Sequence, residues 1–139
     1  EAAKRDVGII VRVPLASGLL TGKYSKNTSF GAGDHRNFNR DGTAFDKGET
    51  FSGVDYETGL EAVDELKKLF PGMENLAPVA LQWILQFPEV SCIIPGASKV
   101  EQVHSNLQVY DLEPLNDEKV KAMNAIYDKY IKADVHPLW

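Results

Sequence analysis

Two short β-branched apolar runs, each followed at once by a glycine-containing loop, constrain the fold of this chain most strongly. The runs cover residues 7–13 and 90–94, and the long stretch between them carries helical periodicity. A connection of that length excludes a hairpin, so the runs are predicted as parallel strands in a right-handed βαβ arrangement. The loops then lie at the carboxyl ends of the strands, where parallel sheets build ligand sites.

The run over residues 7–13 is apolar enough to be buried on both faces, as is usual for a parallel strand. A helix is predicted over residues 57–70, ending at Pro71–Gly72, with an Asp64–Lys68 pair on its polar face. Its apolar positions recur every three or four residues: Leu60, Val63, Leu66 and Leu69. This period predicts an amphipathic helix with one buried face.

Caps mark three further helices. Asn75 can cap the next helix, which tolerates Pro78 in its first turn, is apolar on two sides and stops at Pro88. Ser98 and Glu101 form a predicted capping box for a helix after the second strand. The apolar residues of that helix are expected to face the core: Val100, Val103 and Leu107. The last helix is capped by Asn116, with acidic residues in its first turn and lysines near its end.

The segment between residues 25 and 54 has no clear period and is rich in glycine, asparagine, aspartate, serine and threonine. Loops this long are usually functional lids or disordered. Two strands make no stable sheet alone, so further strands are expected from a missing part or from another chain. The first residues look like the last turn of a helix leading into a strand, so we expect the sequence to begin within a larger protein.

Composition bounds the class of protein. The chain has 139 residues, 43% of them hydrophobic and 25% charged, which suits one globular domain. Its net charge of −5 argues against nucleic-acid or anionic-membrane partners, and no apolar stretch is long enough for membrane insertion. The one cysteine, Cys92, is expected to be buried, which favours a reducing, cytoplasmic location. No cluster has metal-ligand spacing.

The second loop has the features of an anion site. Pro95 and Gly96 are expected to turn the chain, and Ser98 opens a helix whose amides and dipole attract negative charge. Lys99 adds a positive charge, and Gln102 can reach the same point one turn later. A well-capped helix with a solvated lysine explains the same residues equally well.

The first loop places Gly18 and Gly22 around apolar residues, with Lys23 following, and so lets the backbone approach a ligand closely. A purely structural glycine-rich loop is the alternative. Cys92, within a strand, is expected to be a core residue and not a nucleophile.

Taken together and in this order, these stretches resemble the aldo-keto reductases, specifically the C-terminal half of their barrel. The resemblance covers nearly the whole chain. It rests on PLASGLLTGKY (residues 14–24), ALQWIL (80–85) and IIPGASK-x-EQ-x-x-x-N, which ends at Asn106. It implies an α/β fold that is the C-terminal portion of a (β/α)8 TIM barrel, incomplete as a closed barrel, with residues 1–139 forming one cofactor-binding unit.

The resemblance also implies NADPH-dependent reduction of a small carbonyl substrate, an aldehyde or ketone. Five residues would lie along the cofactor pyrophosphate: Leu15, Ala16, Ser17, Gly18 and Lys23. Four would surround the 2′-phosphate of the adenosine: Gly96, Ser98, Lys99 and Gln102. Asn106 would meet the adenine edge, and Arg36 or Arg40 would help the 25–54 segment cover the cofactor.

Three positions depart from the family pattern. Arg12 stands where many members place an aromatic residue that stacks on the nicotinamide. Gln102 replaces the arginine of some branches, with Lys99 as a substitute for its charge, and Ser105 stands where an acidic residue often precedes the asparagine. These changes weaken the expected contacts to the nicotinamide and to the 2′-phosphate.

No catalytic residue is assigned, because the family's catalytic Asp, Tyr, Lys and His belong to a half that this chain does not match. The three histidines are expected to be surface residues: His35, His104 and His136. Three interpretations stay open. The chain is the cofactor half of a reductase that needs the missing N-terminal half, a non-enzymatic NADPH-binding regulatory subunit, or a half-barrel that pairs with a second copy. The long loop and Leu138–Trp139 are candidates for one wall of the substrate pocket.

Overall fold

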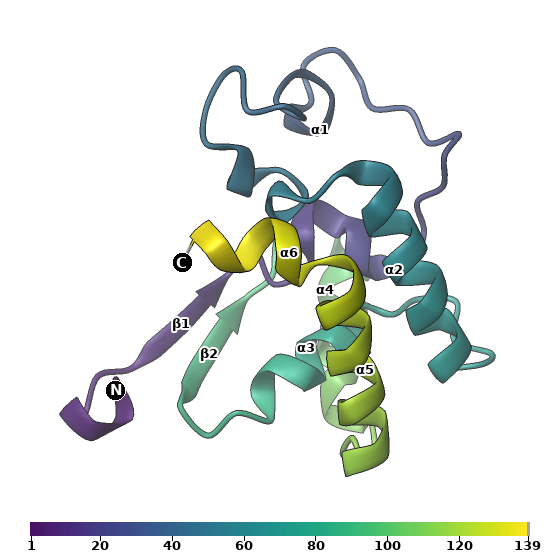
Figure 1. Ribbon diagram of the computed structural model, residues 1–139. Coiled ribbons are helices and arrows are strands. Elements are labelled where there is room, and N and C mark those ends of the chain that lie inside the picture. Colours follow the sequence, from purple (N-terminus) through teal and green to yellow (C-terminus); the bar gives the residue numbers. More distant parts are fainter. Residues whose placement is uncertain (139) are drawn as a thin grey trace.

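The computed structural model describes residues 1–138, and Trp139, part of the candidate pocket wall, lies outside them. Strands β1 (Ile9–Arg12) and β2 (Val90–Ile94) pair in parallel, with Ile10 beside Cys92 and Arg12 beside Ile94 (Figure 1). The predicted strands and their parallel pairing are therefore confirmed. β1 is shorter than the apolar run over residues 7–13.

Six α-helices complete the regular structure of residues 1–138, with short 3-10 turns between them. In chain order these helices are α1 (His35–Phe38), α2 (Tyr56–Leu69), α3 (Ala77–Leu85), α4 (Val100–Leu107), α5 (Asp117–Tyr130) and α6 (Lys132–Val135). The 3-10 turns are Ala3–Arg5, Ala16–Thr21, Lys47–Glu49, Phe51–Gly53, Gln108–Asp111 and His136–Leu138. Helix α3 packs on β2, and α5 packs along α2 (Figure 1).

Helix α2 begins at a side-chain cap, since the Asp55 carboxylate accepts hydrogen bonds from the Thr58 amide at 3.0 Å and hydroxyl at 3.1 Å. The chain leaves the helix through Gly72, whose φ of +84° favours glycine. Leu60 and Val63 are buried as predicted. The predicted Asp64–Lys68 pair is wrong. Each lysine instead pairs with the carboxylate three residues before it, Lys67 with Asp64 and Lys68 with Glu65.

Two other predicted caps are present. The Asn75 side chain accepts a hydrogen bond from the Ala77 amide at 3.1 Å, just ahead of Pro78 in the first turn of α3. Asn116 accepts one from the Lys119 amide at 2.9 Å and begins α5. These short-range bonds satisfy amides that a helix leaves unpaired at its start.

The core lies between α2, α3 and the Ala16–Thr21 turn, beside the sheet and not around it. Its buried members are Ala16, Leu19, Phe51, Tyr56, Leu60, Val63, Phe70, Leu76 and Val79. Phe51 belongs to the 25–54 segment, which thus contributes to the core. Phe30 of the same segment packs edge-on against Tyr24 with ring centroids 5.2 Å apart, and Phe51 lies 4.9 Å from Tyr56. Phe30 and Phe51 of the segment thus form an aromatic cluster with Tyr24 and Tyr56, which flank the segment in the sequence.

The sheet is far more exposed than its composition predicts. Ile10 is 63% exposed and Ile94 is 55% exposed, so β1 is not buried on both faces, and Cys92 is exposed as well. The apolar residues of α4 are also exposed, with Val100 at 67%. The expected burial was wrong because, within residues 1–138, neither edge of the sheet meets a third strand and nothing covers this side of α4.

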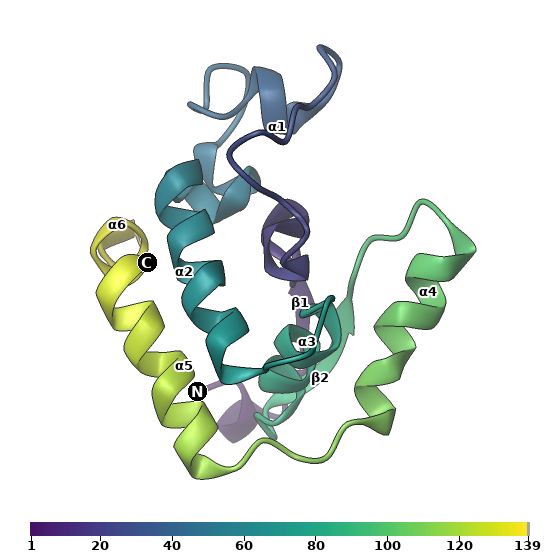
Figure 2. The same cartoon turned by 90° about the vertical axis from the view of Figure 1, so that its right-hand side faces the viewer.

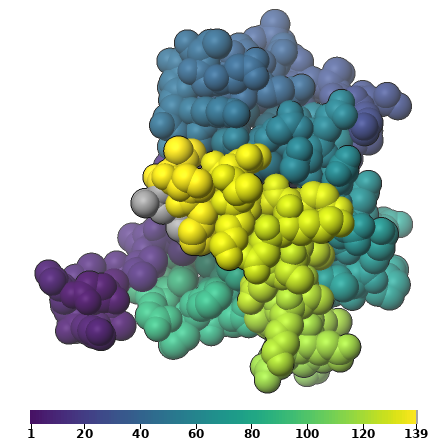
Figure 3. All heavy atoms as spheres, in the orientation of Figure 1, coloured from purple at the N-terminus to yellow at the C-terminus, as the bar shows by residue number. Residues whose placement is uncertain are grey.

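The shape of the molecule follows from this arrangement. Helix α4 stands apart from α2 and α5, on the other side of the sheet (Figure 2). The first residues and β1 project from the body of the molecule (Figure 3). Across residues 1–138, no helix is both long and apolar enough to cross a membrane, and no group of three His, Cys, Asp or Glu side chains could hold a metal ion.

Candidate functional site

A groove of about 1090 Å³ runs across the carboxyl ends of the two strands. Its walls come from the end of β1, the Ala16–Thr21 turn, the 25–54 segment, the start of α3 and helix α4. The sequence-predicted site residues that line it are Leu15, Ser17, Gly18, Lys23, Arg36, Gly96, Ser98, Gln102 and Asn106. The fold therefore brings residues from both predicted loops into one continuous depression.

Two predicted site residues do not line the groove. Ala16 is buried in the core, and Lys99 is exposed outside the lining. Arg40 lies elsewhere too, because its guanidinium stacks 4.6 Å above the Tyr56 ring. Of the two candidate arginines in the 25–54 segment, Arg36 is the one that faces the groove.

The first loop has an unusual backbone. Positive φ angles occur at Val13 (+51°), Ala16 (+47°), Ser17 (+57°), Gly18 (+90°) and Gly22 (+75°). The two glycines adopt this region freely, whereas the other three residues carry strain that the surrounding contacts must hold. A Cβ at Gly18 would lie only 2.6 Å from the Tyr24 hydroxyl oxygen, so a side chain at residue 18 would collide with Tyr24.

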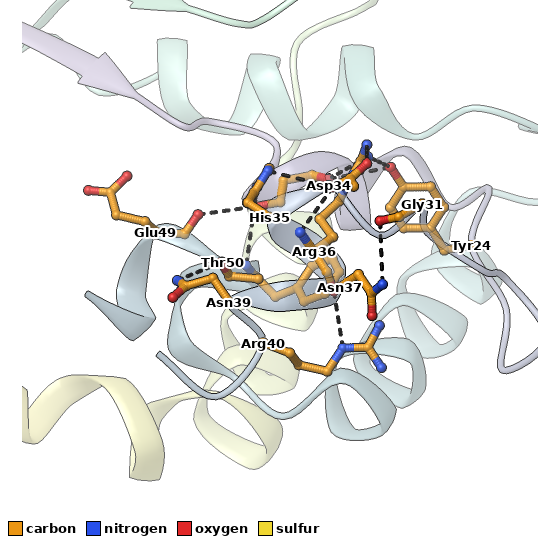
Figure 4. A network of polar contacts seen from close by, with 12 residues as sticks. Tyr24, Gly31, Asp34, His35, Arg36, Asn37, Asn39, Arg40, Glu49 and Thr50 are labelled. Carbon is orange, nitrogen blue, oxygen red and sulfur yellow. Dashed lines mark hydrogen bonds and ion pairs between the residues drawn. The ribbon is translucent and has the colours of Figure 1, made fainter. Parts of the chain in front are cut away.

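Arg36 is fixed by an almost complete set of hydrogen bonds. Its Nε and Nη2 donate to the two carboxylate oxygens of Asp34 at 2.9 and 2.6 Å (Figure 4). Its Nη1 donates to the Tyr24 hydroxyl and, at 3.4 Å, to the Ser17 carbonyl. The hydrogen bonds from Arg36 lower the pKa of Asp34 to about 2, so this carboxylate stays ionised near neutral pH.

A second bidentate ion pair lies at the end of β1. Arg12 donates from both Nη atoms to both carboxylate oxygens of Glu49, each at 2.7 Å. These hydrogen bonds hold the pKa of Glu49 below its ordinary value and raise the pKa of Arg12. Both residues line the groove. The position that the family resemblance marked as aromatic is thus occupied by a guanidinium whose charge is already matched.

Lys23 differs from the two arginines. Its side chain makes no hydrogen bond or ion pair to any part of the chain that the structure describes, although it lines the groove. Arg12 and Arg36 have carboxylate partners, so Lys23 is the groove cation whose charge is uncompensated among residues 1–138. An anionic ligand gains most from such a charge because no carboxylate has to be displaced.

The second loop differs from its predicted form. Residues 95–97 do not form a turn, and the chain bends only at Ser98 and Lys99 before α4 begins at Val100. The predicted capping box of Ser98 and Glu101 is wrong, because the helix starts two residues after Ser98. Instead, the Gln102 side-chain oxygen accepts hydrogen bonds from the Ser98 amide at 2.6 Å and the Lys99 amide at 3.2 Å. An anion reaches these amides only after Gln102 moves.

A short hydrogen bond links helix α4 to the start of α3. The Asn75 side-chain amide donates to the Ser105 hydroxyl at 2.6 Å. Both residues line the groove next to Asn106. Asn75 therefore begins α3 and positions the groove wall at the same time.

Several groove residues were not expected from the sequence. Glu49 and Glu101 line the groove, as does His35, whose Nε2 lies 3.4 Å from the Ser17 hydroxyl. The His35 side chain is nevertheless 40% exposed, so it is a surface residue as expected, and His104 and His136 are exposed too. Glu49 gave no sequence signal, because it lies in a segment without period and reaches its partner across 37 positions.

Residues 1–128 match the family model described as the aldo/keto reductase family. The chain is 30% identical over 134 residues to an L-glyceraldehyde 3-phosphate reductase from Escherichia coli O157:H7, covering 96% of this chain and 36% of that protein. It is 32% identical over 114 residues to a probable voltage-gated potassium channel subunit beta from Arabidopsis thaliana, covering 78% and 31%. The chain spans about a third of the length of the curated relatives that it matches.

Solved structures give the same result. A glycerol dehydrogenase from Gluconobacter oxydans superimposes with a TM-score of 0.68 at 27% identity, over 94% of this chain and 37% of that one. An aldo-keto reductase from Bacillus halodurans, in its apo form, shares the fold with a TM-score of 0.56 at 22% identity. The α/β arrangement seen here thus recurs within larger proteins.

Proposed function

Since the chain belongs to the aldo/keto reductase family, we propose that its groove binds the dinucleotide NADP(H) for the reduction of aldehydes or ketones. In this proposal, residues 1–139 form the C-terminal, cofactor-binding portion of a (β/α)8 barrel. When bound, the nicotinamide supplies a hydride for a carbonyl carbon. The residues of this chain hold and orient the dinucleotide, and we expect the chain alone to show no turnover of simple aldehydes.

The observation that carries this proposal is the groove itself. Its volume of about 1090 Å³ suits a ligand longer than an ordinary small molecule. Its lining includes hydrogen-bond donors and cations from both loops, among them Lys23, Ser98 and Asn106. These features fit a dinucleotide with its charge at the centre.

Each part of the groove has a distinct task in this proposal. Lys23 and Arg36 bind the pyrophosphate, together with the exposed backbone around Ser17 and Gly18. Ser98 and the start of α4 hold the 2′-phosphate after Gln102 has turned away, with Lys99 adding charge from outside the lining. Asn106 meets the adenine edge.

Binding of NADPH and NADH, followed by nicotinamide fluorescence or calorimetry, tests the proposal. Lys23→Met should weaken binding of both by about 10- to 100-fold, as expected for loss of a hydrogen bond to a charged group. Lys26→Met is the matched control, because Lys26 pairs with Glu57 outside the groove. If Lys23→Met and Lys26→Met bind NADPH like the unaltered chain, the groove is not the dinucleotide site.

The 2′-phosphate is tested separately. Lys99→Glu should weaken the binding of NADPH far more than the binding of NADH, because only NADPH carries that phosphate. An equal effect on both would mean that Lys99 does not read the phosphate, and the preference for NADP(H) would be abandoned while dinucleotide binding stands.

A second candidate function is a non-enzymatic NADPH-binding regulatory subunit. It is favoured by the similarity to the potassium channel subunit beta of Arabidopsis thaliana. The two functions differ in turnover. The protein as it occurs naturally should oxidise NADPH in the presence of an aldehyde if it is a reductase, and should bind NADPH without consuming it if it is a regulatory subunit.

The partner in this proposal is the rest of the barrel. The exposed apolar residues of β1, β2 and α4 offer a continuation of the sheet, since exposed strand edges and apolar patches mark surfaces that are covered in assembly. Further strands from the N-terminal half would cover them. A second copy of the chain is the alternative, which sedimentation would reveal as a dimer. A monodisperse monomer would contradict self-pairing. A cytoplasmic location, which the free Cys92 supports, is part of the same proposal.

A further inference from the structure

The 25–54 segment contacts the first loop at two places: through His35 and Arg36, and again near its end. The Phe51 amide donates to the Ser17 hydroxyl at 3.2 Å, and that hydroxyl donates to the Glu49 carbonyl at 3.3 Å. The Glu49 carboxylate then makes the bidentate pair with Arg12. Figure 4 shows Glu49 with its carboxylate pointing away from the rest of the polar network. One residue thus joins the segment to both the first loop and the end of β1.

The Arg12 guanidinium depends on this contact for its position. The Arg12 side chain is 65% exposed, and its guanidinium donates to the two carboxylate oxygens of Glu49. A long, exposed side chain with one fixed partner takes its direction from that partner, because a planar guanidinium and a carboxylate match in two bonds at once. Without Glu49, Arg12 would be free to leave the groove wall.

We propose that Glu49 is a positioning residue: its carboxylate holds Arg12 in the groove wall and fastens the 25–54 segment over the β1 end of the groove, so that the pair slows release of a bound dinucleotide. The part about release rests on the proposed function. The part about fastening the segment concerns the chain by itself. The two parts are therefore tested by separate measurements.

Hydrogen exchange of the Phe51 amide, in the chain without ligand, tests the fastening. Glu49→Gln should speed this exchange about two- to fivefold, the effect expected for loss of a largely exposed ion pair. Glu57→Gln is the matched control, because Glu57 pairs with Lys26 on the same segment but outside the groove. It should leave the Phe51 amide unchanged. Unaltered exchange in Glu49→Gln would overturn the proposal.

Two further variants separate positioning from a general structural role. Arg12→Lys keeps the charge but cannot form two parallel hydrogen bonds to Glu49. In this variant the Phe51 amide should therefore exchange as fast as it does in Glu49→Gln. The double variant Arg12→Glu with Glu49→Arg restores the pair with its charges exchanged and should return protection to within about twofold of the original. Fast exchange in the double variant would contradict a direct contact between the two residues.

The release of NADPH, measured by stopped-flow displacement, tests the second part. Glu49→Gln should raise the release rate by the same two- to fivefold and leave the association rate unchanged. If NADPH does not bind the unaltered chain, the proposed function fails together with this second part, while the exchange of the Phe51 amide still decides the fastening. An unchanged release rate with faster exchange would overturn the role in release alone.

Discussion

Gly18→Ala offers a direct test of the close approach in the first loop. The added Cβ would meet the Tyr24 hydroxyl oxygen at 2.6 Å, and the φ of +90° is unfavourable for alanine. Left-handed backbone costs about 1–2 kcal/mol outside glycine, and overpacking costs about 1–3 kcal/mol more. We therefore expect the free energy of unfolding to fall by about 2–5 kcal/mol.

Gly72→Ala is the control that separates the two terms. Gly72 has a similar φ of +84°, but nothing lies within 4 Å of a Cβ at that position. Its substitution should cost only the backbone term, about 1–2 kcal/mol. Urea unfolding followed by circular dichroism measures both variants, with the slope of each transition checked for unchanged two-state behaviour.

The clash can also be relieved. In Gly18→Ala with Tyr24→Phe the hydroxyl is gone, and the next atom of the ring lies 3.2 Å from the Cβ. In a double-mutant cycle, Tyr24→Phe should therefore restore about 1 kcal/mol of the stability that Gly18→Ala loses. The single variant Tyr24→Phe corrects for the lost contact between Tyr24 and Arg36. If Gly18→Ala and Gly72→Ala lower the free energy of unfolding by amounts within about 0.5 kcal/mol of each other, the predicted clash with Tyr24 is refuted.

Two other predictions concern the 25–54 segment. Asn39 is fully buried and accepts hydrogen bonds from the Ala44 and Phe45 amides at 3.0 and 2.9 Å. Asn39→Ala should therefore lower the free energy of unfolding by about 2–4 kcal/mol, whereas Asn37→Ala should change it by less than about 0.5 kcal/mol. Equal losses of stability for the two variants in urea unfolding would contradict this prediction. The pKa of Asp34 falls from 3.8 to about 2 on folding, so its stabilising contribution is complete above about pH 4 and is lost as the pH falls toward 2. Asp34→Asn should remove that part of the acid sensitivity, and identical pH profiles of stability would show that the carboxylate makes no contribution.

Local signals in the sequence predicted the local structure well. The apolar runs gave both strands and their parallel pairing, and the caps Asn75 and Asn116 mark the starts of α3 and α5 as expected. Such features depend on residues within one or two turns of each other. Most predicted site residues lie in one groove for a related reason: each loop directly follows its strand.

The errors arose where long-range packing decides the outcome. Burial of Ile10 and of the α4 face depends on what packs against them, which a period in the sequence does not specify. Gln102, and not Glu101, caps the start of α4, because the helix begins one residue later than the predicted Ser98 cap implies. Glu49 reaches Arg12 across a segment without period, and no local pattern marks such a contact.

The aromatic cluster of the 25–54 segment has a thermodynamic consequence. The contacts among Tyr24, Phe30, Phe51 and Tyr56 lie within the chain itself, so we expect them to order the segment before a ligand binds. A ligand entering the groove does not have to order it. Calorimetry should therefore show neither the large unfavourable entropy nor the large negative heat-capacity change that accompany folding of a loop upon binding.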